Sequence, residues 1–172
     1  MKIFYVHHAL RDMGNPPSQE DDILPLGEED ANIVAESLND LSKKLNFKAI
    51  YTSPYLRCKK TSLIINKYIK VPIYDEPRFN EFNNVFNAVK GKALDSGEET
   101  WCECQLRIRS AIKDIVDAYN DNDTVICVTS GVNITAFISL AFGVDPSNKL
   151  PFPIVMGCSP ICFDINKDAF CH

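Results

Sequence analysis

The chain has 172 residues, of which 45% are hydrophobic and 24% are charged, and its formal net charge is -5 at pH 7. This composition is typical of a globular domain and excludes a disordered or fibrous chain. The acidic balance argues against a general nucleic-acid-binding protein, because affinity for the phosphate backbone comes mainly from clustered Lys and Arg side chains.

The sequence shows neither a membrane helix nor a signal peptide, since no apolar run approaches the roughly 20 residues that a membrane helix needs. We therefore expect one domain over residues 1–172, in the cytosol and without a membrane partner. The seven cysteines are then expected to be reduced thiols, with Cys127 and Cys162 as small core residues. Their spacing matches no zinc pattern, so neither a metal nor another cofactor is expected.

The first predicted element is a strand over residues 3–6, where four apolar and aromatic residues follow one another without alternation, as in a strand buried on both faces. The run stops at His7 and His8. In open α/β sheets, ligands bind in the crevice beyond the carboxyl ends of the strands, and we expect His8 to point into it. The simpler alternative is that both histidines only close a strand.

Residues 9–26 form a polar loop that is too long for a simple connection, so we expect it to line or cover the site. From Gly27 the pattern becomes that of an amphipathic helix packed on the sheet, with apolar residues on one stripe and charged residues opposite. The stripe consists of Ala31, Val34, Ala35, Leu38, Leu41 and Leu45.

A second strand is predicted over residues 49–51. Ser53 is expected to be the N-cap of the following helix, with Pro54 as its first residue and its end near Ile69. A third strand is predicted over residues 71–74.

Residues 75–96 carry mixed signals and are expected to be mostly loop with a short helix. Thr100 and Glu103 form a capping box in front of a helical pattern that ends near Asn120. The apolar, β-branched run over residues 124–129 then predicts a buried strand.

An apolar helix is predicted over residues 132–142, closed by Gly143 at the position after its end. A last strand is predicted over residues 161–165, and residues 154–156 are a further candidate. Because strands alternate with helices along the chain, we predict an α/β fold, a three-layer α/β/α sandwich with a mostly parallel central sheet.

Polar residues follow three of the predicted strands. His8 follows the first, the segment from Ser53 to Arg57 follows the second, and Ser130 follows the strand over residues 124–129. Arg57 lies in the first turn of its helix, where its guanidinium and the free backbone N–H groups can face one crevice. Ser130 precedes a second helix N-terminus, which also favours anions. Together these residues predict a phosphate site.

Residues 51–61 read Tyr-Thr-Ser-Pro-Tyr-Leu-Arg-Cys-Lys-Lys-Thr. They resemble the S-S-P-L-x-R-A-x-Q-T segment of the histidine phosphatase superfamily, whose members have the phosphoglycerate-mutase-like fold. Residues 25–31 resemble the P-L-G-x-x-Q-A entry to the family's first helix, and residues 77–81 resemble the L-x-E segment that carries its proton donor. The resemblance covers most of the chain and implies the same fold. The matched positions in the first segment are Ser53, Pro54, Leu56, Arg57 and Thr61.

The resemblance also implies roles for three residues. His8 would be the nucleophile that takes up the phosphoryl group, which splits the transfer to water into two easier steps. Arg57 would bind phosphoryl oxygens by a bidentate contact. Glu81 would protonate the leaving oxygen and later activate water.

Two positions depart from the family pattern. His7 stands where the R-H-G-E motif has its arginine, and Ser130 stands where the S-H-G motif has the second catalytic histidine. Each lost donor costs about 10²- to 10³-fold in rate, so both together cost about 10⁴- to 10⁶-fold if they act independently. The Ser130 hydroxyl, a protonated His7 and Arg11 are the candidate replacements for the missing phosphate contacts.

The sequence therefore predicts a metal-independent phosphomonoesterase of the histidine phosphatase type, with low or specialised activity on a small phosphorylated metabolite. A catalytically silent relative that binds a phosphorylated ligand or a partner protein is the alternative. A metal site at His7 and His8 is a third interpretation. Mutase activity is disfavoured, because the retention and return of a phosphoryl group call for a complete set of phosphate contacts.

Overall fold

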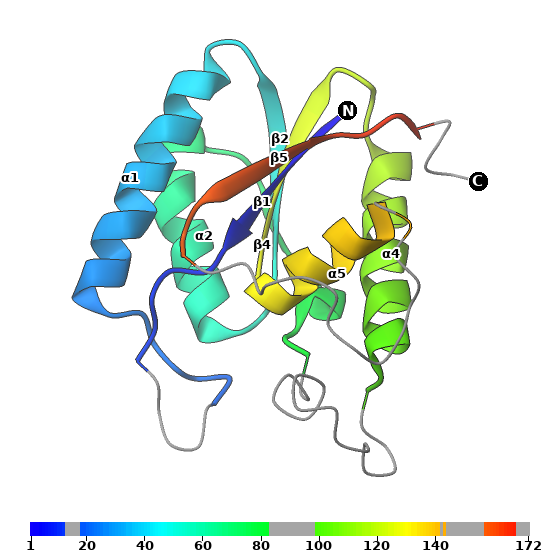
Figure 1. Cartoon of the computed structure of the whole chain (residues 1–172). Coiled ribbons are helices and arrows are strands. Elements are labelled where there is room, and N and C mark those ends of the chain that lie inside the picture. Colours follow the sequence, from blue (N-terminus) through cyan, green and yellow to red (C-terminus); the bar gives the residue numbers. More distant parts are fainter. Residues whose placement is uncertain (13–17, 83–98, 142, 144–156, 168–172) are drawn as a thin grey trace.

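The computed structural model describes residues 1–12, 18–82, 99–141, 143 and 157–167 (Figure 1). Within these residues the chain forms a five-stranded sheet in the order β3-β2-β4-β1-β5. Strands β1 to β4 run parallel to one another, and β5 runs antiparallel to β1. The mostly parallel sheet of the prediction is thus confirmed. The strands are β1 (Lys2–His7), β2 (Asn46–Thr52), β3 (Ile73–Asp75), β4 (Asp123–Thr129) and β5 (Pro160–Asp164).

Helices cover both faces of this sheet, which makes the three-layer sandwich (Figure 1). The side chains of Ile3 and Tyr5 pack with α4 and α5 on one face, while Phe4 and Val6 pack with α1 and α2 on the other. This alternation follows from the period of two along a strand. The helical elements are α1 (Pro25–Ser42), α2 (Leu56–Ile69), the 3-10 turn η1 (Pro77–Phe79), α4 (Trp101–Ala118) and α5 (Gly131–Ala141).

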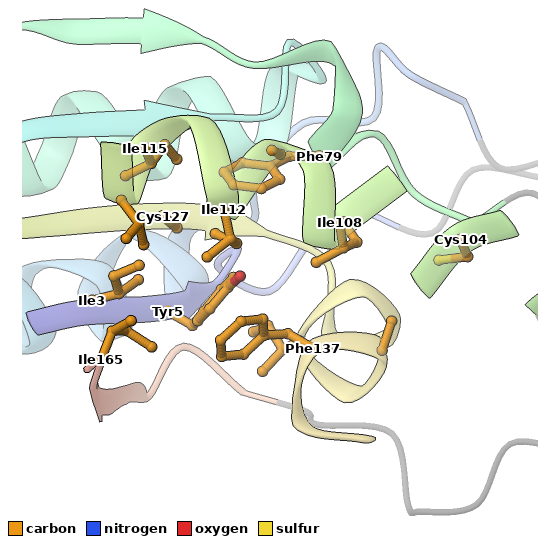
Figure 2. Close-up of a cluster of buried hydrophobic side chains, with 14 of the residues drawn as sticks. Ile3, Tyr5, Phe79, Cys104, Ile108, Ile112, Ile115, Cys127, Phe137 and Ile165 are labelled. Atoms are coloured by element: carbon orange, nitrogen blue, oxygen red, sulfur yellow. The ribbon is translucent and has the colours of Figure 1, made fainter. Parts of the chain in front are cut away.

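The core on the α4 and α5 face is built on aromatic contacts (Figure 2). The ring centroids of Tyr5 and Phe137 lie 5.0 Å apart, and those of Tyr5 and Phe79 lie 6.4 Å apart. Phe79 is fully buried at the end of η1. Glu81 follows Phe79 by two residues. The packing of Phe79 in the core therefore fixes the position of the backbone that carries Glu81.

The start of α2 differs from the prediction. The helix begins at Leu56 with Tyr55 as its N-cap, so the assignment of Ser53 as the cap and Pro54 as the first residue is wrong. The reason is that the backbone N–H of Ser53 donates to the Val128 carbonyl at 3.0 Å and extends the sheet. The Ser53 hydroxyl donates to Asn80 Oδ1 at 3.1 Å and accepts from the N–H of Tyr55 at 3.4 Å.

The ends of the other helices lie closer to the positions predicted from the sequence. The capping box of Thr100 and Glu103 is present, and Gly143 has a φ of 64° and donates to the Leu140 carbonyl, as expected after a helix end. Helix α1 begins at Pro25, and Leu41 of the predicted stripe is 39% exposed. The expected strand at residues 154–156 lies outside the described residues, as do residues 83–96 of the expected loop.

All six described cysteines are free thiols. Cys127 is buried as predicted, but Cys162 is exposed. In edge strand β5, Ile161 and Phe163 join the core cluster on the α4 and α5 face, so Cys162 points the other way. None of the described helices has the length and apolar character required to cross a membrane.

Gly27 allows the start of α1 to touch the chain that follows His8. A Cβ at this position would lie 2.3 Å from the Leu10 carbonyl oxygen, far inside van der Waals contact. The N–H of Leu24, the N-cap of α1, donates to that same carbonyl at 2.9 Å. The glycine of the P-L-G sequence therefore permits a close contact between α1 and Leu10, and this contact holds the backbone that follows His8.

We expect Gly27→Ala to lower the free energy of unfolding by about 1–3 kcal/mol, because the backbone of Leu10 has to move to admit a methyl group. Urea denaturation measures the change. Glu29→Ala, an exposed change in the same helical turn, is the control and should stay close to the wild type. Equal stability of the Gly27 variant and the wild type would contradict this account of the contact.

Candidate active site

Three neighbouring strand ends meet at one edge of the sheet. The N–H of His8 donates to the Thr129 carbonyl at 3.0 Å, and the N–H of Ser53 donates to the Val128 carbonyl at 3.0 Å. These two bonds join the chain after β1 and the chain after β2 to the end of β4. The polar residues that the sequence placed at strand ends therefore lie together, as parallel register requires.

His8 presents a neutral imidazole of defined orientation. Its Nδ1 lies 2.9 Å from the Ala9 carbonyl oxygen, and because a carbonyl only accepts hydrogen bonds, we assign the ring proton to Nδ1. Burial, reinforced by the neighbouring His7 ring, lowers the pKa of His8 to about 2. The remaining nitrogen, Nε2, thus carries a free lone pair at neutral pH, which is the form that a nucleophile needs.

Thr61 joins the His8 loop to helix α2. Its hydroxyl oxygen accepts from the Ala9 N–H at 3.0 Å and donates to the Arg57 carbonyl at 2.7 Å. The residue after His8 is thereby held one helical turn from Arg57. Thr61 was matched in the sequence only as part of a motif, and the structure gives it this positioning contact.

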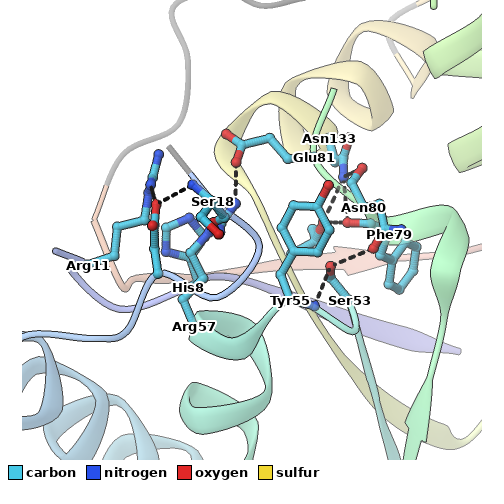
Figure 3. Close-up of polar contacts among 12 residues, drawn as sticks. His8, Arg11, Ser18, Ser53, Tyr55, Arg57, Phe79, Asn80, Glu81 and Asn133 are labelled. Carbon is cyan, nitrogen blue, oxygen red and sulfur yellow. Dashed lines mark hydrogen bonds and ion pairs between the residues drawn. The ribbon is translucent and has the colours of Figure 1, made fainter. Parts of the chain in front are cut away.

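Arg57 is a buried cation, with only 1% of the residue exposed. Its Nη1 donates to the Ser18 carbonyl at 3.1 Å, and its Nη2 forms an ion pair with the Glu81 carboxylate. The guanidinium also lies over the Tyr55 ring, 4.7 Å from the centroid. Arg57 and Glu81 are thus in direct contact, and Figure 3 shows them gathered with His8 and Ser18.

The backbone amides at the start of α2 are less available than predicted. The N–H of Leu56 donates to the Gln19 carbonyl, and those of Cys58 and Lys59 donate to the Tyr55 carbonyl. The expectation that several free N–H groups of this helix face a ligand is therefore wrong. Arg57 contributes its charged side chain, while the loop at Gln19 satisfies the helix end.

His7 stacks on His8, with the ring centroids 4.2 Å apart. Burial, followed by the charge of Arg57, lowers the pKa of His7 to about 4. The ring is therefore neutral near pH 7. A positive charge at His7, which the sequence suggested as a replacement for the missing arginine, requires an anion beside it.

Ser130 lies directly after β4, and 2% of the residue is exposed. Its hydroxyl, His7 Nδ1 and Arg57 Nε are buried polar atoms without a hydrogen-bond partner in the described part of the chain. Buried polar atoms are nearly always bonded, so orphaned ones call for an explanation. The clustering of three such atoms at one sheet edge favours a site for a ligand with several hydrogen-bonding oxygens.

Arg11 lies near the two histidines but is engaged elsewhere. Its guanidinium pairs with the Asp21 carboxylate, which also accepts from the Ser18 N–H at 3.0 Å. Its charge still contributes to lowering the pKa values of His7 and His8. Arg11 therefore orders the segment whose Ser18 carbonyl meets Arg57, in addition to supplying positive charge.

Sequence reasoning missed the residues that hold the Glu81 segment. The Asn133 side-chain amide donates to the carbonyls of Phe79 and Asn80, and the Thr129 hydroxyl also donates to Phe79. The available signal was an asparagine inside an otherwise apolar helix. No cluster of three or more His, Cys, Asp or Glu suited to a metal ion occurs among the residues that the structure describes.

A sequence model of the histidine phosphatase superfamily, branch 1, matches residues 19–88 and 84–170 of the chain. The chain belongs to this superfamily. No curated protein matches it by sequence.

Solved structures show the same fold. The chain is 21% identical to Bacillus stearothermophilus YhfR, with 96% of this chain and 91% of that one covered and a TM-score of 0.79. A mycobacterial glucosyl-3-phosphoglycerate phosphatase in complex with VO3 is 14% identical, with 94% and 90% covered and a TM-score of 0.74. A mutant phosphoserine phosphatase from Entamoeba histolytica, in complex with phosphoserine, is 18% identical, with 94% and 89% covered and a TM-score of 0.68. These likenesses confirm the phosphoglycerate-mutase-like fold.

The two buried histidines make stability depend on pH. Burial holds the pKa values of His7 and His8 at about 4 and about 2, below the ordinary 6.5, so the folded protein keeps both rings neutral in mild acid. The unfolded chain takes up these protons as the pH falls below about 6.5, which favours unfolding. We expect the free energy of unfolding to fall by on the order of 1 kcal/mol per pH unit for each ring between about pH 6 and pH 4.

Urea unfolding at a series of pH values in phosphate-free buffer measures this slope. His7→Asn and His8→Asn should each flatten it, since an amide takes up no proton. If both variants kept the wild-type slope, the neutral state of the buried rings would be wrong.

Proposed function

We propose that the chain is a metal-independent phosphomonoesterase that hydrolyses a small phosphorylated metabolite through a phosphohistidine on His8. The observation that carries the proposal is an arrangement at the carboxyl ends of the parallel strands. A neutral His8 lies there with the buried Arg57, and the Glu81 carboxylate is paired with Arg57. Membership of the superfamily and phosphatases among the structures with the same fold support the reaction class.

In the first step of the proposed reaction, His8 Nε2 attacks the phosphorus atom and the bond to the leaving oxygen breaks. Once displaced from Arg57, the Glu81 carboxylate takes up a proton from the solvent. It gives this proton to the leaving oxygen, so the product leaves as an alcohol. In the second step, the Glu81 carboxylate takes a proton from water, whose oxygen attacks the phosphorus. The phosphorus–nitrogen bond breaks, inorganic phosphate leaves, and His8 and Glu81 return to their first states.

Arg57 supplies the charge that the transferring phosphoryl group requires. Because Glu81 is paired with Nη2 of Arg57, a phosphoryl oxygen has to take the place of the carboxylate there. The exchange releases Glu81 from Arg57 and leaves the carboxyl group beside the incoming substrate. Binding of the phosphoryl group and release of the proton donor are therefore one event.

His7, Ser130 and Arg11 complete the proposed phosphate site. The unpartnered Ser130 Oγ and Arg57 Nε can donate to phosphoryl oxygens, and Arg11 adds charge. His7 Nδ1 can donate only when it carries a proton, which an anion beside the ring favours. A serine hydroxyl and a neutral imidazole replace a histidine and an arginine of the family pattern. The site thus holds less positive charge, which accounts for a low or specialised activity.

One observation favours the alternative of a catalytically silent relative that binds a phosphorylated ligand or a partner protein. Both terminal nitrogens of Arg57 already have protein acceptors, Ser18 and Glu81. If this pairing persisted with a ligand present, Glu81 would have no part in proton transfer. The two functions are separated by the fate of the phosphoryl group.

An aryl phosphate assay with EDTA tests the proposed reaction. We expect turnover by the wild type and a loss on the order of 10⁴-fold in His8→Ala, because the nucleophile is removed. Mass spectrometry after alkaline quenching should detect phosphate on His8. Equal rates in both proteins, with phosphate binding retained, would support the silent binder instead, and turnover abolished by EDTA would contradict a metal-independent mechanism.

Vanadate binding followed by calorimetry separates the two arginines. We expect Arg57→Ala to weaken binding by about 10- to 100-fold, as for the loss of a charge-assisted hydrogen bond. Arg11→Ala should weaken it less, because the Asp21 carboxylate offsets its charge. The exposed Arg109→Ala is the control. An equal loss in both variants would place Arg11 in direct contact with the anion, and an unchanged affinity in Arg11→Ala would remove it from the site.

A further inference from the structure

We infer that Asn133 of α5 and Arg107 of α4 are positioning residues that hold the backbone of Glu81 for proton transfer. The inference rests on the proposed function, in which Glu81 is the proton donor. It concerns a part of the molecule that the mechanism has not used, which is the set of hydrogen bonds behind the Glu81 segment.

Three successive carbonyls before Glu81 are bound by these two side chains. Arg107 Nη1 donates to the carbonyls of Arg78 and Asn80, the latter at 3.1 Å. Asn133 Nδ2 donates to the carbonyls of Phe79 and Asn80 at 2.8 and 2.9 Å. Figure 3 shows Asn133 against Phe79 and Asn80, with Glu81 leading away from them toward Arg57. Glu81 lies outside any regular helix or strand, so side-chain hydrogen bonds, and not a helix or a sheet, hold the backbone before it in place.

Asn133 is fully buried in a helix of mostly apolar residues, where an amide is costly unless it is bonded. Its Nδ2 also donates to Thr129 Oγ1 at 2.8 Å, and its Oδ1 accepts from Cys104 Sγ at 3.6 Å. Both ends of the amide thus have partners, which fixes its rotation. Because Thr129 is the residue before Ser130, the amide ties the Glu81 segment to the strand end that carries the proposed phosphate contact.

Arg107 is fixed from its other side. Glu99 accepts from Arg107 Nε at 2.5 Å and from Nη2 at 2.8 Å, a bidentate pair that leaves Nη1 for the carbonyls. The guanidinium therefore approaches the segment in one orientation. Helix α4 supplies Arg107 and helix α5 supplies Asn133, and we call these two side chains the clamps of the Glu81 segment. Neither helix carries a residue that takes part in the proposed reaction itself.

The consequence for catalysis follows from what happens at Arg57. Glu81 is held from two sides, by the pairing of its side chain with Arg57 and by the bonds of Arg107 and Asn133 to the Asn80 carbonyl directly before it. Once a phosphoryl oxygen takes its place on Arg57, only the backbone clamps keep the carboxyl group near the leaving oxygen. A general acid has to lie within about 2.6–3.2 Å of the atom that it protonates, so a loosened backbone lowers the rate.

The dependence on the leaving group distinguishes this role from a purely structural one. An aryl oxyanion leaves without a proton, whereas an alkyl oxyanion needs one from the acid. A variant that misplaces Glu81 therefore loses activity toward an alkyl phosphate far more than toward an aryl phosphate. A variant that only weakens the fold loses both activities by the same factor.

The experiment compares kcat/KM for p-nitrophenyl phosphate and for phosphoserine in Asn133→Ala and Arg107→Gln. We expect the loss toward phosphoserine to exceed the loss toward the aryl ester by at least about tenfold in both variants, in the direction of a Glu81→Gln reference whose loss is on the order of 10²- to 10⁴-fold. Arg107→Lys, which retains a donor, should recover part of the difference. Inorganic phosphate should bind the Asn133 and Arg107 variants within about twofold of the wild type, since neither residue is a proposed phosphate contact. Glu81→Gln should bind it more tightly, because the competing carboxylate is gone.

Ser139→Ala is the matched control. Ser139 is also buried on α5 and bonds across to α4, where Gln105 Nε2 donates to its hydroxyl at 2.6 Å, but it has no contact with the Glu81 segment. We expect it to change both activities by the same factor. Thermal unfolding checks each variant, and because Arg107 lies closer to the surface, Arg107→Gln carries the test if Asn133→Ala does not fold.

The inference is overturned if Glu81→Gln shows the selective loss and the clamp variants do not, because Glu81 then works without its clamps. If Glu81→Gln shows no selectivity, or if the wild type turns over neither ester, it is the proposed role of Glu81 that fails. The two failures are therefore told apart in a single set of measurements.

Discussion

The burial of the Arg57 guanidinium is the constraint on which the rest of the site depends. A cation with 1% of its residue exposed has lost its hydration, and the protein has to replace that hydration with acceptors. Glu81 and the Ser18 carbonyl do so, which draws two otherwise irregular segments onto the start of α2. Because the Arg57 guanidinium is buried, leaving it without this carboxylate is costly, so the pairing also determines where those segments lie.

In the proposed mechanism, the same pairing links the binding of the phosphoryl group to the release of Glu81, the proposed proton donor. A phosphoryl group offers the oxygens that Arg57 prefers, and it competes with Glu81 for the guanidinium. The displaced carboxyl group is expected to stay close, because Phe79 at the end of η1 is packed in the core two residues before Glu81. If the proposed mechanism holds, Glu81 is released for proton transfer only when a phosphoryl oxygen takes its place on Arg57. The Arg57–Glu81 ion pair would therefore stabilise the fold and also make proton transfer follow the binding of the phosphoryl group.

How far the sequence could predict this arrangement depends on the range of the interactions involved. The strand ends, the capping box and the positions of His8 and Arg57 were predicted, because hydrophobic runs and local capping patterns specify them within a few residues. The start of α2 was not, because the Ser53 N–H is taken by Val128, about 75 residues away in the chain. The Arg57–Glu81 pair and the Asn133 clamp depend on tertiary contacts in the same way. A buried asparagine shows in a sequence only as a polar residue in an apolar helix, without indicating which carbonyls it binds.

The two substituted positions bear on how long the site would hold a phosphoryl group. In the proposed site one permanent cation, Arg57, contacts the phosphate, while His7 is neutral near pH 7 and Ser130 offers an uncharged hydroxyl. Neutral hydrogen bonds are roughly half as strong as charge-assisted ones. We therefore expect inorganic phosphate and the phosphoryl group on His8 to be held less tightly than in a site with the arginine and the second histidine of the family pattern. Weak retention disfavours the return of a phosphoryl group to a second acceptor, which a mutase requires. It is compatible with hydrolysis, in which water completes the reaction and the product has only to leave.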